Sequence, residues 1–352
     1  MNKEMFRLTI TLAALTVVLF FSAVQSLSFG VIEISFQEIV RMLYYQSFGI
    51  HTPEALQLLA SVHYDVIFEL RLPRIIMAVI CGSSLALGGV VTQAVIRNPL
   101  ADPYILGVSS GAALGATASI ILGSFSMFGI YGVSVGAFMG AIAVTFTVFA
   151  ITFNAAGSRS TTKLILAGTA LNAICSACTG MIVYMAKDME GIRNATFWIM
   201  GSMARTSWDA IPLTVGILGL CCLYFIYQFR ILNASLLGDE MAAILGIELE
   251  TKHKFYLILI AILISSIVAS VGIIGFVGLV IPHIVRIIYG NNHIKLLPVS
   301  IITGAIYMVW CDIFARTVLA NTEIPIGILT SLIGGPFFLY LMLSKKYGYG
   351  DN

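Results

Sequence analysis

The sequence predicts an all-helical integral membrane protein that crosses the bilayer about ten times. Hydrophobic residues make up 59% of the 352 positions and charged residues only 10%, well below the roughly 25% of a soluble domain. Apolar stretches of about 20 residues, enough to cross a hydrocarbon core of about 30 Å, recur along the whole chain. Because no polar block is large enough for a second domain, we expect a single transmembrane domain over residues 1–352.

The predicted spans lie between charged breaks and breaks rich in glycine or proline. The first span follows Lys3 and Arg7 and resembles a signal peptide, but its apolar run exceeds the roughly 7 to 15 residues of such a signal, so we expect it to be retained. The break at 272–278 has glycine at every third position, which is compatible with a tight turn or with irregular backbone buried in protein. The ten spans are 8–27, 74–96, 105–123, 130–153, 163–186, 209–229, 255–271, 274–289, 297–316 and 325–343.

The orientation in the membrane follows from lysine and arginine. An even number of spans places both termini on one side, and the side richer in basic residues is the cytoplasm. With both termini inside, 12 of the 19 basic residues lie on the cytoplasmic side and seven lie outside. We therefore expect cytoplasmic termini, and the outer arginines need a separate explanation.

Two spans carry glycine at every fourth position. Such a ridge lets helix backbones approach closely, which is a main source of helix association in lipid, so we interpret these glycines as packing residues. The six cysteines all fall in apolar stretches, where a packing role is favoured over a disulfide framework. The glycines are Gly107, Gly111 and Gly115 in one span and Gly132, Gly136 and Gly140 in the next.

Motifs that would indicate an enzyme are weak or missing. Gly107 to Gly111 match the G-x-S-x-G pattern around a catalytic serine, but that pattern needs a strand before the turn, and here it opens a membrane helix. The chain has no Gly-Lys pair and therefore no phosphate-binding loop. ATP and magnesium are expected on a partner subunit, with no cofactor or metal held by this chain.

A short amphipathic helix is predicted on the cytoplasmic side, over about 236–247. Asp239 and Glu240 would lie in its first turn, where the helix dipole favours acids, and Gly246 would end it. Its apolar face must be covered by lipid or by a partner protein, and the spacing alone does not distinguish the two.

Three arginines near the outer surface have more than one interpretation. Arg71 and Arg74 flank a helix start at Pro73, and snorkelling to lipid headgroups is the simplest explanation of their charge. Arg316 follows Asp312 by four residues, so their side chains can pair along one helix face. Ion pairs inside a membrane span are candidates for a functional role.

Several segments together resemble one family, the permeases of the type II ABC importers that take up iron–siderophore complexes, haem and cobalamin. They occur in the family's order and extend over most of the chain, from about Arg71 to Tyr340, whereas 49–69 aligns with nothing in the family. The matching segments are Arg71 to Arg74, Asn98 to Pro103, Leu106 to Ala112, Leu166 to Gly168, Leu237 to Gly246, Gly275 to His283 and Glu323 to Gly327.

The resemblance implies the membrane-spanning permease subunit of an ABC importer in a bacterial cytoplasmic membrane. It implies a dimer with a second copy or a paralogous permease, with the translocation path at the two-fold axis. Two ATPase subunits would lie beneath the dimer and an extracytoplasmic binding protein above it, and nucleic acid has no part. The first expectation for the substrate is a ferric siderophore, ahead of haem, cobalamin and molybdate, because siderophore uptake is the family's broadest use.

The resemblance also implies roles for single residues. The predicted cytoplasmic helix becomes the coupling helix that sits in a cleft of the ATPase, with Leu237, Gly238, Glu240, Ala242, Leu245 and Gly246 as its contact residues. Thr161 and Thr162 correspond to the cytoplasmic gate, with Asn98 and Leu100 near a second constriction. Arg71, Arg74 and Arg316 correspond to arginines that meet acidic residues of the binding protein.

Two other classes of protein compete with this interpretation. An ion-coupled secondary transporter also has many spans and broken helices, but it needs buried acids for the coupling ion, and Asp312 is the one candidate in the predicted spans. An intramembrane hydrolase built on Ser109 is the weaker alternative. Transport without an ATPase partner would distinguish the secondary transporter.

Overall fold

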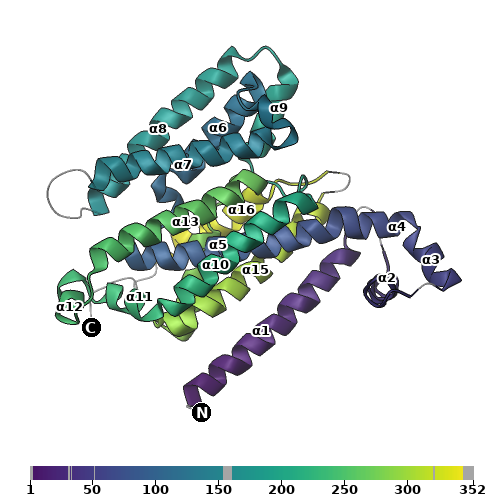
Figure 1. Ribbon diagram of the computed structural model, residues 1–352, viewed down its shortest axis with the longest axis horizontal. Helices are drawn as coiled ribbons and strands as arrows, with labels where there is room; N and C mark the ends of the chain where they lie inside the picture. The colour runs from purple at the N-terminus through teal and green to yellow at the C-terminus, as the bar shows by residue number, and fades with distance from the viewer. Residues whose placement is uncertain are drawn as a thin grey trace.

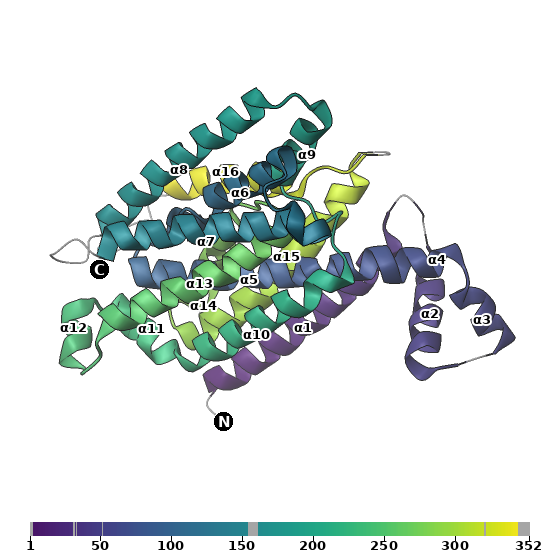
Figure 2. The same cartoon turned by 45° about the horizontal axis from the view of Figure 1, so that its top comes forward.

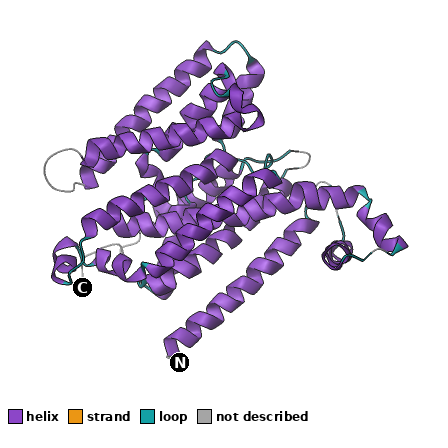
Figure 3. Ribbon diagram, viewed as in Figure 1, coloured by secondary structure: helices purple, strands orange, loops and turns teal. Residues whose placement is uncertain are grey.

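The ten predicted spans are all present as helices in the computed structural model, which describes residues 3–30, 32, 34–50, 52–153, 161–319 and 322–343. Within these residues every regular element is helical (Figure 3), so the predicted fold class is confirmed. Seven helices are long and apolar enough to cross a membrane, while α6, α14 and α16 are shorter apolar helices. The ten are α1 (Lys3–Ser28), α5 (Leu72–Ile96), α6 (Val108–Leu122), α7 (Gly132–Phe153), α8 (Thr161–Met185), α10 (Ile211–Tyr227), α13 (Leu249–Val271), α14 (Val277–Tyr289), α15 (His293–Thr317) and α16 (Ile326–Leu343).

Helix α5 is the centre of the bundle, with α13, α14 and α15 packed around it (Figure 1). Its backbone touches two neighbours at glycines. A Cβ added to Gly82 would lie 2.1 Å from the carbonyl oxygen of Gly304 in α15, and one added to Gly89 would lie 1.8 Å from that of Gly278 in α14. These contacts help to hold the helices together, because lipid is as apolar as the helices and the hydrophobic effect does not drive them to associate.

The predicted glycine ridges lie at the contact between α6 and α7. A Cβ on Gly111 would lie 2.3 Å from the carbonyl oxygen of Gly140, and one on Gly115 would lie 2.0 Å from that of Gly136. The predicted packing role of these glycines is confirmed.

The break between α13 and α14 is a stretch of irregular backbone rather than a tight turn. Gly272 and Phe276, at its two ends, both have positive φ, 75° and 67°. Between them the Tyr104 hydroxyl donates a hydrogen bond to the Ile274 carbonyl oxygen at 3.0 Å and accepts one from the Ile274 N–H at 3.3 Å. A side chain therefore satisfies backbone groups that lipid could not.

The segment between the first two spans is helical, where the sequence predicted a long loop over 49–69. Ser35 and Thr52 cap the first two of its helices by accepting bonds from Glu38 N–H and Ala55 N–H. The π-helical turn that follows runs directly into α5, so the helical run Val62–Ile96 is 35 residues long. The elements are α2 (Phe36–Phe48), α3 (Pro53–Leu59), α4 (Val62–Asp65) and η1 (Val66–Arg71), and they project from one end of the bundle (Figure 2).

Helix α1 lies at the periphery, and only 11% of its most apolar 18-residue stretch is buried inside the protein. It packs mainly on α15, where Trp310 Nε1 donates to Ser22 Oγ at 3.1 Å and Lys295 pairs with Glu4 at 3.0 Å. The remaining helices connect the spans: α9 (Met189–Ile199), α11 (Phe229–Leu236), α12 (Asp239–Ile244), η2 (Pro103–Leu106), η3 (Ser126–Tyr131) and η4 (Trp208–Ala210).

Candidate functional site

The predicted cytoplasmic helix is present as α12, which is shorter than the expected range of 236–247. It lies at the same end of the bundle as the start of α1 (Figure 1). Its C-terminus closes with Gly246 at φ 75° and a bond from the Ile247 N–H to the Ala242 carbonyl oxygen at 2.9 Å, an arrangement that favours glycine. The predicted stop at Gly246 is confirmed.

Four apolar side chains are exposed on α12 and its flanks. Leu237, Met241, Ile244 and Leu245 are 57%, 51%, 78% and 59% exposed. Met241, Ile244 and Leu245 are spaced so that they lie on one side of a helix, and Leu237 lies just before α12, next to Gly238 at φ 93°. Of the other predicted coupling residues, Glu240 and Gly246 are exposed and Gly238 is half-buried. Ala242 is fully buried, so its side chain packs within this chain and not on an exposed surface.

The connection after α5 is tied to α12 by an ion pair. Arg97, which ends α5 in the left-handed conformation at φ 55°, pairs with Asp239 at 3.1 Å. In the next turn the Asn98 side chain accepts a bond from the Leu100 N–H at 2.9 Å, which fixes the turn. The exposed Asn98 therefore lies one residue, and the half-buried Leu100 three residues, from the side chain that binds α12.

The same connection continues through Asp102, whose carboxylate accepts a bond from the Tyr104 N–H at 2.8 Å and so caps η2. Burial raises the pKa of Asp102 to about 6, and the bond from Tyr104 opposes this rise.

The start of α8 holds the other predicted gate residues. Thr162 is exposed, while the side chain of Thr161 lies outside the described residues. Further along α8, a Cβ on Gly168 would lie 2.2 Å from the carbonyl oxygen of Ile105 in η2. The structure therefore brings the helix of Thr162 against the segment that contains Asn98 and Leu100.

At the opposite end of the bundle, five charged residues form what we call the arginine network: Arg71, Arg74, Asp312, Arg316 and Glu323. Asp312 is fully buried and lies between two arginines, 2.6 Å from Arg74 Nε and 3.0 Å from Arg316 Nε. Arg74 also donates to both carboxylate oxygens of Glu323 at 2.9 Å. The predicted pair of Asp312 and Arg316 is confirmed.

Two members of the network bind the end of α1. Arg71 donates to the carbonyl oxygens of Leu27 and Ile32, and Arg316 donates to the Phe29 carbonyl oxygen at 2.9 Å. Gly30 allows this approach, since a Cβ there would lie 2.5 Å from the Arg71 guanidinium.

Burial changes the interpretation of these arginines. Arg71, Arg74 and Arg316 are only 6%, 7% and 8% exposed, so snorkelling to lipid headgroups, which the spacing favoured for Arg71 and Arg74, is wrong. Glu323 is the accessible carboxylate of the network, with 43% of its side chain exposed.

Residues 15–344 match the FecCD transport family. The chain belongs to this family. It is 40% identical to the hemin transport system permease of Yersinia pestis over 286 residues, which cover 80% of this chain and 84% of that protein. It is 36% identical to the molybdate import system permease of Haemophilus influenzae over 337 residues, 96% of each chain.

A solved structure described as an inward-facing conformation of a metal-chelate type ABC transporter superposes on this FecCD permease with a TM-score of 0.80 and 34% identity. The match covers 94% of this chain and 98% of that one. The FecCD chain is accordingly a multi-pass permease subunit of the ABC importer type, and the resemblance inferred from the sequence is confirmed.

Sequence reasoning missed the long-range ion pairs at both ends of this FecCD permease. Arg97 pairs with Asp239 across 142 residues, and Arg74 pairs with Asp312 across 238 and with Glu323 across 249. Helical periodicity detects only partners three or four residues apart. One signal was available, because an acidic residue inside a span, such as Asp312, needs a buried partner.

Proposed function

We propose that this chain translocates a metal chelate, with a ferric siderophore as the first candidate, through a dimer driven by two ATPase subunits. Haem, cobalamin and molybdate are the alternatives, and the hemin and molybdate permeases among its relatives support that range. The second permease of the dimer would be another copy or a paralogue. The dimer would lie in a bacterial cytoplasmic membrane, with its termini and α12 in the cytoplasm.

The main support for a partner ATPase is the exposed apolar face of α12. The exposed apolar side chains of α12 need a covering surface, and a protein cleft can enclose this helix of six residues together with Leu237 and Leu245. The ion pair between Arg97 and Asp239 would then transmit movement of α12 to the connection that contains Asn98 and Leu100. This link supports a coupling role for α12 and a gate at the start of α8.

The surroundings of Asp312 argue against the ion-coupled secondary transporter. A carboxylate that binds a coupling ion must be open to that ion, but Asp312 is fully buried and held by two arginines. We therefore favour the importer.

We also propose that the binding protein docks over the end of the bundle that holds the arginine network. Arg71, Arg74 and Arg316 are already bonded inside the protein, so an acidic residue of the partner would reach Arg74 by taking the place of Glu323. Arginine suits this exchange because its planar fork holds a carboxylate by two hydrogen bonds.

Two substitutions in α12 test the coupling role, because they differ in where the new charge lies. Leu245→Asp places a charge on the exposed face, so we expect a normally folded permease that loses its ATPase. An unpaired charge buried at such an interface costs several kcal/mol, so copurified ATPase and uptake into vesicles should fall at least about tenfold.

Ala242→Asp is the matched comparison, since it buries a charge inside the permease itself. We expect poor yield or early thermal unfolding of that variant before any partner is added. Normal copurification and uptake by Leu245→Asp would show that α12 does not bind the ATPase. Substrate accumulation on an ion gradient by vesicles that hold this chain alone would support the secondary transporter instead.

A further inference from the structure

Helix α2 carries an exposed apolar stripe that no described part of the chain covers. Phe36, Val40, Tyr44 and Phe48 are 47%, 44%, 51% and 71% exposed. They are spaced four residues apart and therefore lie along one side of the helix. We call these four residues the α2 stripe.

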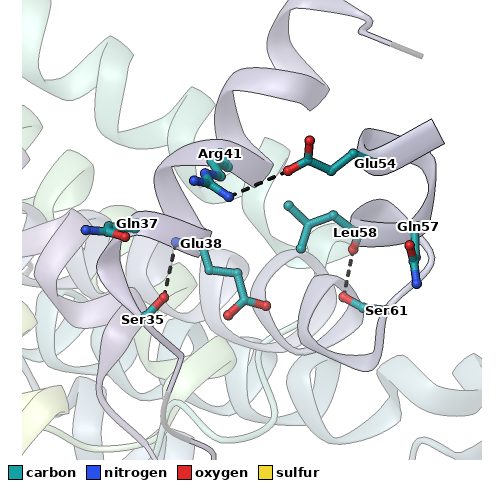
Figure 4. Close-up of a pocket in the computed structure, with 8 residues that line it drawn as sticks. All are labelled: Ser35, Gln37, Glu38, Arg41, Glu54, Gln57, Leu58 and Ser61. Carbon is teal, nitrogen blue, oxygen red and sulfur yellow. Dashed lines mark hydrogen bonds and ion pairs between the residues drawn. The ribbon is translucent and has the colours of Figure 1, made fainter. Parts of the chain in front are cut away.

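The other sides of α2 are occupied by the protein itself. Ile39 and Met42 are fully buried. The polar side faces α3, where Arg41 lies 3.6 Å from Glu54 across a cleft lined mainly by polar side chains (Figure 4). No residue of the α2 stripe lines this cleft, so the stripe is a third, separate face.

The position of α2 is set by the arginine network. Arg71 and Arg316 hold the Leu27, Phe29 and Ile32 carbonyl groups, which lie just before α2. The helix is therefore kept at the level where α1 ends, on the outer side of the bundle in the predicted orientation.

The direction of α2 fits a membrane surface. In Figure 1 α5 runs across the page whereas α2 is seen end-on, so α2 lies across the direction of the spans. A helix across the spans, at the level where a span ends, lies in the plane of the membrane. Exposed apolar side chains also lead toward it from α1, with Phe20 and Phe21 at 71% and 61% and Phe29 and Ile32 at 38% and 40%.

We propose that α2 is an interfacial helix whose stripe rests in the outer leaflet, at the boundary between headgroups and acyl chains. Amphipathic helices of this kind bury their apolar face about 5–10 Å into that boundary, and aromatic residues with a polar tip, such as Tyr44, are enriched there. A lipid surface suits the stripe better than a docking protein does, because the stripe has no charged member and follows exposed apolar side chains of α1 in the chain. Reversible protein interfaces have a polar rim.

Spin labels on two faces of the α2–α3 unit test this proposal in nanodiscs. Val40→Cys places a nitroxide in the stripe, and Gln57→Cys on the exposed side of α3 is the matched control. Both are made in a Cys178→Ser, Cys222→Ala background, because those two native thiols are the accessible ones among the six, and the labelled background supplies the baseline. The rate at which each nitroxide collides with oxygen, which concentrates in lipid, is compared with the rate at which it collides with a water-soluble nickel chelate.

We expect the ratio of oxygen to nickel collisions to be several-fold higher at Val40 than at Gln57. Phe48→Cys, at the exposed end of the stripe, repeats the measurement should the Val40 label disturb the helix. Equal ratios at the stripe and at Gln57 would overturn the proposal. It would also be overturned if the stripe label were open to nickel until a binding protein was added, since the stripe would then be a protein docking face.

Discussion

At the level of single residues, Asp312 is the charge on which the arginine network depends. It is fully buried and lies within 3.0 Å of two arginines that are themselves below 9% exposed. A buried ion pair is not in itself strongly stabilising, but removing one partner leaves an uncompensated charge. Here the loss would affect Arg74 and Arg316 together, and with them the end of α1.

We therefore predict that Asp312→Asn destabilises the permease strongly. Breaking a buried pair costs about 3–5 kcal/mol, which should appear as a clear drop in the thermal unfolding temperature of the purified protein in detergent. Glu323→Gln is the control, because it removes a carboxylate that also binds Arg74 but is 43% exposed, and a smaller shift is expected. Equal shifts in the two variants would contradict the central place given to Asp312.

At the level of helices, backbone contacts at glycines decide which spans lie side by side. Gly82 and Gly89 lie seven residues apart on α5 and meet two different helices, α15 and α14. One side of α5 thus positions both neighbours, including the helix that carries Asp312.

The glycine contacts predict opposite effects for two Gly→Ala substitutions. In Gly89→Ala the new Cβ would lie 1.8 Å from the Gly278 carbonyl oxygen, so α5 and α14 must separate, at a cost of about 1–3 kcal/mol or more. In Gly216→Ala, within α10, the Cβ meets no described atom within 4 Å, and the better helix propensity of alanine should leave stability unchanged or raised by up to about 1 kcal/mol. Thermal unfolding of both variants in one detergent measures the difference, and a neutral Gly89→Ala would refute the close contact.

At the level of the whole molecule, one chain segment connects α12 with α8 at the same end of the bundle. The chain from Arg97 to Ile105 touches α12 at one end and α8 at the other. Movement imposed on α12 by a partner can therefore reach the helix that begins at Thr161 without crossing the rest of the bundle.

We predict that cysteines at the start of α8 cross-link between the two permeases of the dimer in some nucleotide states only. Thr162→Cys in the Cys178→Ser, Cys222→Ala background is the first variant, because Thr162 is exposed, and Thr161→Cys is the second. A gate at a two-fold axis must change its separation during the cycle. The yield of cross-linked dimer is measured without nucleotide and with ATP or ADP, and a yield that never changes would argue against a moving constriction at this position.

The sequence by itself determined the fold class, the positions of the ten apolar helices and the packing role of the glycine ridges, because hydropathy and residue spacing are local properties of the chain. It also located the short helix α12 and the pair of Asp312 and Arg316, which share one helix face. It failed over 49–69, where it predicted a loop, because short helices have no apolar run of 20 residues and depend on caps such as Thr52 and on packing.

Only the tertiary structure decided what the charges do. Arg74 meets Asp312 across 238 residues and Glu323 across 249, and Ala242 lies inside the protein although it belongs to an exposed segment. Partners so far apart in the chain come together only after the helices have packed, and that packing depends on contacts such as the one between Gly82 and Gly304. Periodicity along one helix carries no information about which other helix it will touch.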